Sequence, residues 1–474
     1  MKSIVVLFLI VASPFVAAQP CPVSCPTLDD AAVQALLDGG GDVQLEPRLY
    51  QICKPLVLPS NTHLRGTRGA TVIRAGANLE GIVVNGSYVQ SLVAAVGVDN
   101  VSISDLTVDL FTCGAPANGV SLLPASVTGS QSYDGAVVTN ATVENVEILG
   151  TPGIHSYMIW NLRGRHVRYL NNWIDGKSTA AGFSQEGMES YGGYDVLMSG
   201  NTVKNMGASC VIIGSGTGAI AATDLQGVRV VDNHLSACTV GIYLASVGMS
   251  AGESNSHTKI SGNVIVDSRQ IGIDVPVFSG TVERDLQITD NTIRNVTASL
   301  GAGIRLWTVQ GTSAGSYGVV GTVVEGNHIE NISGANSFGI MIHHYPNARI
   351  LNNTIIGTSA ESVFIQNSTN VDVTGNRIEQ SGGPAIGIYR QGVAANSISG
   401  FIIERNRISN WLAATTGILA LGAHSGTMRD NVFQRTDTST TVPIYLDSSC
   451  GVTISGNLAW YLPSWGGVST PGCP

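Results

Sequence analysis

The chain has 474 residues, of which 43% are hydrophobic and 12% are charged, and it contains 57 glycines. A composition with so little charge excludes an intrinsically disordered chain. The formal net charge is −9 and no Lys/Arg cluster is present, which argues against nucleic acid as a partner. An anionic polysaccharide stays open as a partner, because a local cleft can differ in sign from the whole molecule.

Residues 1–18 have the pattern of a secretory signal peptide. Lys2 precedes an apolar run over residues 4–11, and small residues at 16–18 form a cleavage site. No later segment has the ~20 continuous apolar residues that are needed to cross a bilayer. We therefore expect a protein without a membrane span, secreted to the extracellular space or, in a bacterium, to the periplasm.

All eight cysteines follow this segment, and an even number in an exported chain favours disulfide bonds. A bond between Cys450 and Cys473 would hold the C-terminal tail. The cysteines expected to hold the other end are Cys21, Cys25, Cys53 and Cys113.

A short helix is expected next. Residues 27–30 resemble a capping box, residues 31–37 continue with helical spacing, and three glycines at 39–41 end the pattern. Such a helix would cover apolar side chains and strand edges that otherwise end in water. We assign residues 19–66 to this cap and the first strands.

One phrase is then repeated through most of the chain. In DLQITDNTIRNVTASLGAGIRLW (residues 285–307), alternating apolar residues lead to an asparagine, a second apolar run, a polar turn and a third apolar run. The asparagine recurs at spacings of 23 to 36 residues. Strand-type alternation at this period predicts a β-solenoid, in which each coil buries its apolar face against its neighbours. The marker asparagines are Asn145, Asn172, Asn201, Asn233, Asn263, Asn291, Asn327, Asn353, Asn376, Asn406, Asn431 and Asn457.

These asparagines have a structural interpretation. Identical side chains in stacked coils lie ~4.8 Å apart, so one amide can donate a hydrogen bond to the next.

The segment GGDVQLEPRLYQICKPLVLPSNTHLRG (residues 40–66) resembles the opening of the pectin-lyase-like superfamily of right-handed parallel β-helix repeat proteins. The matching features are a glycine turn, a V-x-L-x-P strand, and the Y-x-I, L-x-L-P-S and L-x-G phrases. The resemblance implies an all-β fold: a single-stranded right-handed parallel β-helix of about a dozen coils with an N-terminal α-helical cap. We place this β-helix in residues 67–457 and a C-terminal cap or tail in residues 458–474. The superfamily contains lyases, hydrolases, epimerases, esterases and non-catalytic adhesins, so the fold selects no activity.

Alternation within each strand decides which side chains face outward. Because Ile304 and Leu306 are expected to point inward, Arg305 and Trp307 must point outward. The same rule, applied coil by coil, places ten polar and aromatic side chains on one outer ribbon. The outer ribbon consists of His155, Tyr157, Glu189, Tyr191, Tyr243, Asp274, Arg305, Trp307, His343 and Tyr389.

Aromatic side chains suit the faces of sugars, and Arg and His suit their hydroxyl and carboxylate groups. We therefore predict that the outer ribbon binds a glycan or a polysaccharide substrate. The alternative is a solvated face on which Asp274 and Arg305 merely form a surface ion pair, which would contribute at most ~1 kcal/mol.

Four ribbon residues are candidates for catalysis. β-Elimination and C5-epimerisation of a uronate need a cation that neutralises the carboxylate and a base that removes the adjacent proton. Arg305 suits the first role, and His343 or Tyr243 suits the second. Asp274 can orient Arg305 or contribute to a Ca²⁺ site; otherwise we expect no cofactor and no metal site. The residues expected to bind substrate are His155, Tyr157, Glu189, Tyr191, Trp307 and Tyr389.

Two other functions stay open. Glu189 and Asp274 lie three coils, or about 14 Å, apart, which exceeds the roughly 6.5–9.5 Å of an inverting carboxyl pair. A glycoside hydrolase would therefore need acids on long loops, such as Glu186, Asp224 and Glu253. The other alternative is a non-catalytic adhesive or glycan-binding β-helix. The carboxylate cluster of calcium-dependent lyases, the D-P-H motif of alginate epimerases and the G-H-G turn of hydrolases are missing from this sequence. The sequence decides neither the sugar nor the oligomeric state.

Overall fold

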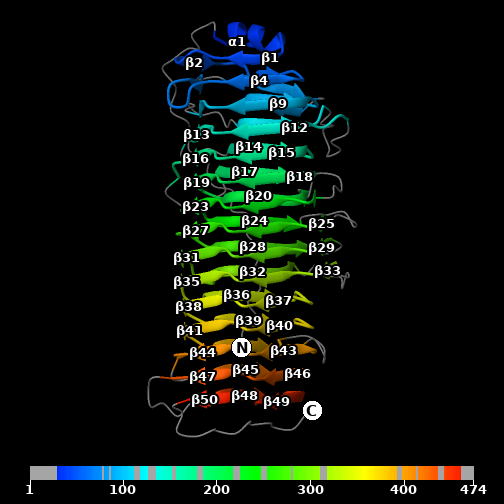
Figure 1. Cartoon of the computed structure of the whole chain (residues 1–474), viewed down its shortest axis with the longest axis vertical. Helices are drawn as coiled ribbons and strands as arrows, with labels where there is room; N and C mark the ends of the chain where they lie inside the picture. The colour runs from blue at the N-terminus through cyan, green and yellow to red at the C-terminus, as the bar shows by residue number, and fades with distance from the viewer. Residues whose placement is uncertain are drawn as a thin grey trace.

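The computed structural model is one solenoid of stacked coils, with the helix at one end and the last strands at the other (Figure 1). The expected signal peptide, His155, and Cys21, Cys25, Cys113 and Cys473 lie outside the described residues. The structure describes residues 29–76, 79–84, 87–110, 118–125, 135–151, 156–178, 185–216, 225–246, 254–278, 281–309, 318–391, 398–412, 415–435 and 442–460.

Helix α1 (Asp29–Asp38) caps the first coil as expected. The Asp29 carboxylate accepts a 2.9 Å hydrogen bond from the backbone N–H of Gln51. The amide of Gln34 donates to the carbonyl of Val57 and accepts from its N–H, at 2.8 and 2.9 Å. Side chains of the helix thus satisfy edge groups that would otherwise be free to pair with another chain.

Three parallel sheets run along the solenoid, with 19, 15 and 14 strands among the described residues. Sheet A extends from β1 (Gly41–Gln44) to β49 (Cys450–Ser455). Sheet B extends from β2 (Leu49–Ile52) to β50 (Leu458–Trp460). The coils therefore begin before residue 67 and continue slightly beyond residue 457.

Sheet C contributes one strand to each coil and carries the outer ribbon, and its 14 strands agree with the expected dozen or so coils. Its strands are β3 (Leu56–Leu58), β8 (Ser91–Val96), β11 (Asn118–Leu123), β14 (Ser156–Leu162), β17 (Gln185–Tyr191), β20 (Ser209–Gly216), β24 (Val240–Ser246), β28 (Ile271–Phe278), β32 (Ala302–Val309), β36 (Phe338–His343), β39 (Val363–Gln366), β42 (Ile386–Tyr389), β45 (Ile418–Leu421) and β48 (Ile444–Asp447).

The predicted register is confirmed in the centre of sheet C. Ile242, Ile273, Ile304 and Ile340 are register partners on four successive strands, and all four are fully buried. The β-branched side chain of isoleucine packs well on a pleated surface, so a stack of identical residues suits this position in the core.

The asparagine ladder is also confirmed. The Oδ1 of Asn291 accepts from both the backbone N–H and the Nδ2 of Asn263, at 3.0 and 2.9 Å. The Nδ2 of Asn291 then donates to Oδ1 of Asn327 at 2.9 Å. Each buried amide is thereby satisfied by its neighbours. The ladder comprises Asn172, Asn201, Asn233, Asn263, Asn291, Asn327, Asn353, Asn376, Asn406, Asn431 and Asn457.

Placing Asn145 in this ladder was wrong. The ladder position of its coil belongs to Val146, whose backbone N–H donates to Oδ1 of Asn172 at 3.0 Å. Asn145 instead adopts a left-handed conformation, with φ of 54°. Asparagine is compatible with the ladder position and with a left-handed conformation, so the sequence pattern assigned the ladder position one residue too early in this coil.

Cys210 and Cys238 form a disulfide bond between adjacent coils, with both side chains in the core and a Cα–Cα distance of 5.6 Å. Cys53 and Cys450 are also disulfide-bonded, and their expected partners lie outside the described residues. No helix in the described part of the chain has the length and apolar character to span a membrane.

Candidate functional site on the outer face of sheet C

The structure places nine of the ten ribbon residues on the outer face of sheet C; His155 lies outside the described residues. Their strands run down the centre of the view in Figure 1. One row of register partners contains Glu189, Tyr243, Asp274 and Arg305. A second row, two positions further along the strands, contains Trp307, His343 and Tyr389. Tyr191 is two positions beyond Glu189 on β17, and Tyr157 pairs with Glu186.

Asp274 and Arg305 form a bidentate ion pair at the centre of this face. Arg305 donates from Nε and Nη2 to the two carboxylate oxygens of Asp274, at 2.8 and 2.6 Å. The indole Nε1 of Trp307 donates to the same carboxylate at 2.9 Å, and the Arg305 guanidinium lies 4.8 Å from the Trp307 ring centroid. Two donors of the guanidinium are therefore occupied, and its other N–H groups remain for a ligand.

This pair is not the solvated surface pair considered from the sequence. The side chain of Asp274 is 3% exposed and that of Arg305 is 18% exposed. Desolvation of both charges offsets much of their attraction, so a buried pair is weak as a means of stabilising the fold. The pair is well suited to holding the Arg305 guanidinium in one orientation.

Tyr243 and His343 lie on opposite sides of the pair, on β24 and β36. Burial and the Asp274 carboxylate raise the pKa of Tyr243, so its phenol remains protonated at neutral pH. Burial and the positive charges of His344 and Arg305 lower the pKa of His343 to about 4. His343 is therefore a neutral imidazole at neutral pH and can accept a proton.

His344 does not belong to the outer ribbon. It adopts a left-handed φ of 53° where the strand ends, and its Nε2 lies 3.1 Å from Nδ2 of Asn367. Within the described ranges, no three His, Cys, Asp or Glu side chains gather closely enough to hold a metal ion.

Beyond His343, the outer face carries a row of aromatic rings. The centroids of Phe338 and Phe364 are 4.7 Å apart, and those of Phe364 and Tyr389 are 5.1 Å apart. The Tyr389 hydroxyl donates to Glu361, and burial together with this carboxylate raises the pKa of Tyr389. Phe338 was not predicted as a site residue, because alternation places a residue two positions before the buried Ile340 on the inner side.

A pair of glutamates occupies the other end of the outer face. Glu189 is 1% exposed, and its Oε2 makes no hydrogen bond. Burial, followed by the charge of Glu186 and a hydrogen bond shared with it, raises the pKa of Glu189 well above its usual value, whereas the Trp160 indole lowers it. Burial therefore favours the protonated form of Glu189. The other two loop acids considered from the sequence, Asp224 and Glu253, lie outside the described residues.

An apolar cluster separate from the main core packs beside these glutamates. It contains Val89 on the hairpin strand β7 (Ser87–Val89), together with Leu123 and Leu162 of sheet C. Trp160 and Tyr191 pack against it. The hairpin thus contributes to a low-dielectric environment that favours the neutral form of an acid.

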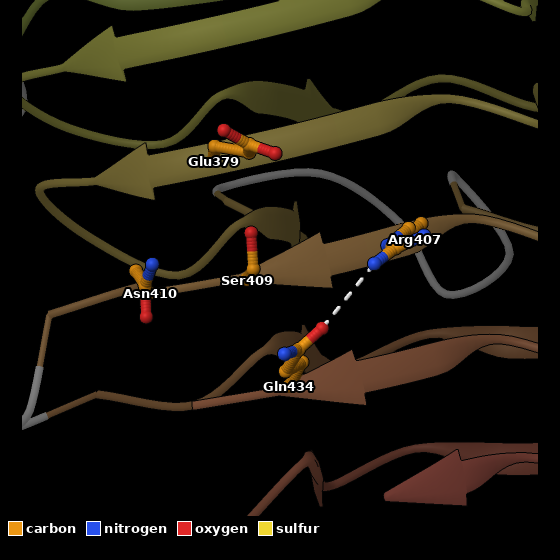
Figure 2. Close-up of a pocket in the computed structure, with 5 residues that line it drawn as sticks. All are labelled: Glu379, Arg407, Ser409, Asn410 and Gln434. Carbon is orange, nitrogen blue, oxygen red and sulfur yellow. Dashed lines mark hydrogen bonds between the residues drawn. The ribbon is translucent and has the colours of Figure 1, made fainter. Parts of the chain in front are cut away.

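A small polar hollow lies elsewhere, on sheet B. Figure 2 shows the side chains that line it on β41 (Arg377–Ser381), β44 (Arg407–Ser409) and β47 (Val432–Gln434). Arg407 donates to Gln434 at 3.4 Å, and Glu379 accepts from Arg377 at 2.7 Å. None of the outer-ribbon residues lines this hollow.

Solved structures with the same architecture include sugar-binding proteins. The tailspike protein of E. coli bacteriophage HK620, solved as a double mutant with a pentasaccharide, is 12% identical with a TM-score of 0.56, over 90% of this chain and 76% of that chain. The catalytic domain of a GH87 α-1,3-glucanase with nigerose is 14% identical with a TM-score of 0.53, over 81% and 70% of the two chains. The A-module of mannuronan C-5 epimerase AlgE6 from Azotobacter vinelandii is 17% identical over 96% and 98%, but its TM-score of 0.33 supports no argument.

At such low identity these likenesses show the fold alone. No curated protein matches the sequence. The family described as the right-handed β-helix region matches residues 80–314 and 308–400. The chain therefore belongs to the right-handed β-helix family, and its resemblance to the pectin-lyase-like superfamily is confirmed.

Proposed function

We propose that this protein is exported and acts on a uronate-containing polysaccharide that lies along the outer ribbon. The reaction is β-elimination or C5-epimerisation, at a centre formed by Tyr243, Asp274, Arg305 and His343. The observation that carries the proposal is the bidentate ion pair that fixes Arg305 between a protonated phenol and a neutral imidazole. The saccharides bound to the tailspike protein and the glucanase support a glycan as the ligand of this fold.

Each residue has a distinct role in this chemistry. The free N–H groups of Arg305 bind the uronate carboxylate, which makes the adjacent C5 proton more acidic. His343 accepts that proton. Tyr243 lies three strand steps, or about 14 Å, from His343, so its hydroxyl binds the neighbouring sugar and not the same C5. In elimination a proton from water goes to the leaving O4 as the C4–O4 bond breaks; in epimerisation a proton from water goes to the other face of C5. Asp274 keeps the guanidinium in place throughout.

The proposal is tested by incubating the purified protein with pectin, alginate and glycosaminoglycans. New ultraviolet absorbance of an unsaturated uronate identifies a lyase, and exchange of the C5 proton with deuterated solvent identifies an epimerase. Reducing ends without absorbance would instead identify a hydrolase, and no change with any polymer would favour a binding protein.

Two substitutions then test the site. Arg305→Lys keeps the charge but loses the fork of donors, so we expect it to lower turnover more than Trp307→Phe does. His343→Gln is expected to lower turnover by a factor on the order of 10²–10⁴. Because His343 must be neutral to accept a proton, turnover of the wild-type protein should also fall as the pH drops toward its pKa of about 4. Unchanged rates in both variants would refute this site.

A further inference from the structure

The glutamate end of the outer face has a chemistry that the proposed reaction does not use. β14 and β17 are adjacent strands, on which Tyr157 pairs with Glu186 and Trp160 pairs with Glu189. The rings of Tyr157 and Trp160 are stacked, with centroids 5.2 Å apart and an interplanar angle of 19°. Tyr157, Trp160 and Glu186 are each half-buried, so a ligand on the face can reach them.

Polar atoms buried here lack partners. Glu189 Oε2 and Trp160 Nε1 both make no hydrogen bond. Leaving a buried polar atom unsatisfied costs about 1–3 kcal/mol, so each such atom calls for an explanation. A ligand with hydroxyl groups supplies both donors and acceptors, and would satisfy such atoms if it opened the cluster slightly.

Burial and the groups around Glu189 favour its neutral form. The titratable groups that face Glu189 are Glu186 on the same strand, Tyr191 two residues later and Tyr169 on β15 (Arg165–Leu170). Burial and the nearby glutamate charge raise the pKa of both tyrosines, so they remain neutral. Glu186 lies three residues before Glu189 on the same strand and is half-buried, so its carboxyl group can accept hydrogen bonds from a ligand on the face.

A stacked aromatic pair beside a carboxyl acceptor suits a neutral sugar. The rings pack on the apolar C–H face of a pyranose, and the carboxylate accepts hydrogen bonds from its hydroxyl groups. A uronate would meet a like charge here, in a setting of reduced dielectric. Arg305 offers the opposite charge four strand steps from Glu186, at roughly 19 Å, which is about the length of four sugar residues.

We propose that Tyr157, Trp160 and Glu186 form a subsite for a neutral sugar, so that the substrate is a heteropolysaccharide rather than a polyuronate. The neutral sugar residue lies about four positions from the uronate held by Arg305. Glu189 is a positioning residue that acts through Glu186. This inference rests on the proposed function, in which the polysaccharide lies along the outer ribbon, and it specifies the class of substrate.

Binding is the direct test, because it does not depend on turnover. Cello-, xylo-, manno- and maltohexaose serve as neutral probes and hexagalacturonate as the charged probe, each titrated calorimetrically. We expect at least one neutral hexasaccharide to bind, and Glu186→Gln and Tyr157→Ala each to weaken it roughly tenfold. Tyr445→Ala, an aromatic change on β48 of the same sheet, is the matched control and should leave the affinity unchanged.

Glu189 is tested by the pH profile. Glu189→Gln keeps a neutral donor, so we expect it to bind as the wild-type protein does when Glu189 is protonated, and to lose the decline in affinity that the wild-type protein shows once the pH rises above the raised pKa of Glu189. Glu189→Leu removes the donor and should weaken binding at every pH. A residue with only a structural role would not change the pH profile.

The outcomes separate this inference from the proposed function. If no neutral hexasaccharide binds, or if binding survives Glu186→Gln combined with Tyr157→Ala, the subsite is refuted even where uronate turnover depends on Arg305. If neutral binding depends on Glu186 but no uronate polymer is converted, the subsite stands and the uronate chemistry is refuted.

Discussion

Neighbouring positions on the same four strands of sheet C have opposite characters. The inner positions are Ile242, Ile273, Ile304 and Ile340, and the outer positions are Tyr243, Asp274, Arg305 and Met341. Every inner residue must fit the coil above and the coil below, so the same side chain recurs. The outer residues have no such requirement, and each coil can present a different group. The inner side thus specifies the fold, and the outer side is available for chemistry.

The largest effect is expected from a charge on the inner side. Ile304→Asp buries a carboxylate among fully buried isoleucines, which costs several kcal/mol, and should prevent folding. The matched control is Gln287→Asp, which adds the same charge at an exposed position on β30 (Gln287–Thr289). Circular dichroism that is native-like for Ile304→Asp would overturn the register.

Substitutions in the asparagine ladder should destabilise the fold nearly as much, and should do so more at the centre of the ladder than at its end. Asn291→Ala removes hydrogen bonds to Asn263, Asn327 and the carbonyl of Ile260, and leaves buried groups unsatisfied. We expect a loss of about 4 kcal/mol in the free energy of unfolding, measured by denaturant titration. Asn457→Ala, at the last and partly buried position, should cost about 1 kcal/mol. Equal losses would show that the ladder does not stabilise the coils in this way.

Variants of the ion pair between Asp274 and Arg305 can separate its effect on stability from its effect on turnover. Arg305→Met leaves Asp274 charged and buried, and should lower the free energy of unfolding by about 3 kcal/mol. Asp274→Leu combined with Arg305→Met removes both charges and should recover most of that loss. We expect the double variant to be stable but inactive. If it keeps its turnover, the pair serves the fold alone.

Glu189→Gln should produce the smallest change, and one that depends on pH. In the unfolded chain the carboxyl ionises near pH 4.3, whereas the raised pKa keeps it protonated in the folded protein. The wild-type protein therefore loses stability as the pH rises from about 4.3 toward the folded pKa, because the unfolded state binds fewer protons. The variant should melt at a higher temperature than the wild-type protein at pH 7 and at a similar temperature at pH 3. Glu144→Gln, the same substitution on β12 (Thr139–Glu144), is the matched control.

Much of the fold was predictable because the signals that specify it are local. Alternation in a strand depends on adjacent residues, so the inward stack and the adjacency of Asp274 and Arg305 could be predicted from the sequence. The asparagines recur once per coil, which made their hydrogen bonding predictable as well. Asn145 shows the limit of a local signal, because the repeat looks the same whether the ladder position of that coil falls on Asn145 or one residue later.

The rest of the site depends on parts of the chain that are distant in sequence. Trp160, the register partner of Glu189, packs against the apolar cluster to which Val89 contributes, and no pattern near residue 189 reveals that arrangement. The burial of Asp274 and the hydrogen bond from the Trp307 indole to its carboxylate could not be predicted either. Each of these contacts joins two coils, and a local sequence pattern describes only one of them. Cys210 and Cys238 were recognised as disulfide candidates, but their pairing with each other was not predicted.

The asparagine ladder also bears on how such a chain can evolve. Each coil presents an amide acceptor on one side and an amide donor on the other, so any coil can be joined to any other at this corner. Duplication or deletion of a whole coil would leave the junction intact, because the new neighbours meet through the same hydrogen bonds. A gene can therefore lengthen or shorten its outer ribbon by one coil at a time, and adjust the number of sugars it spans without redesigning the interior.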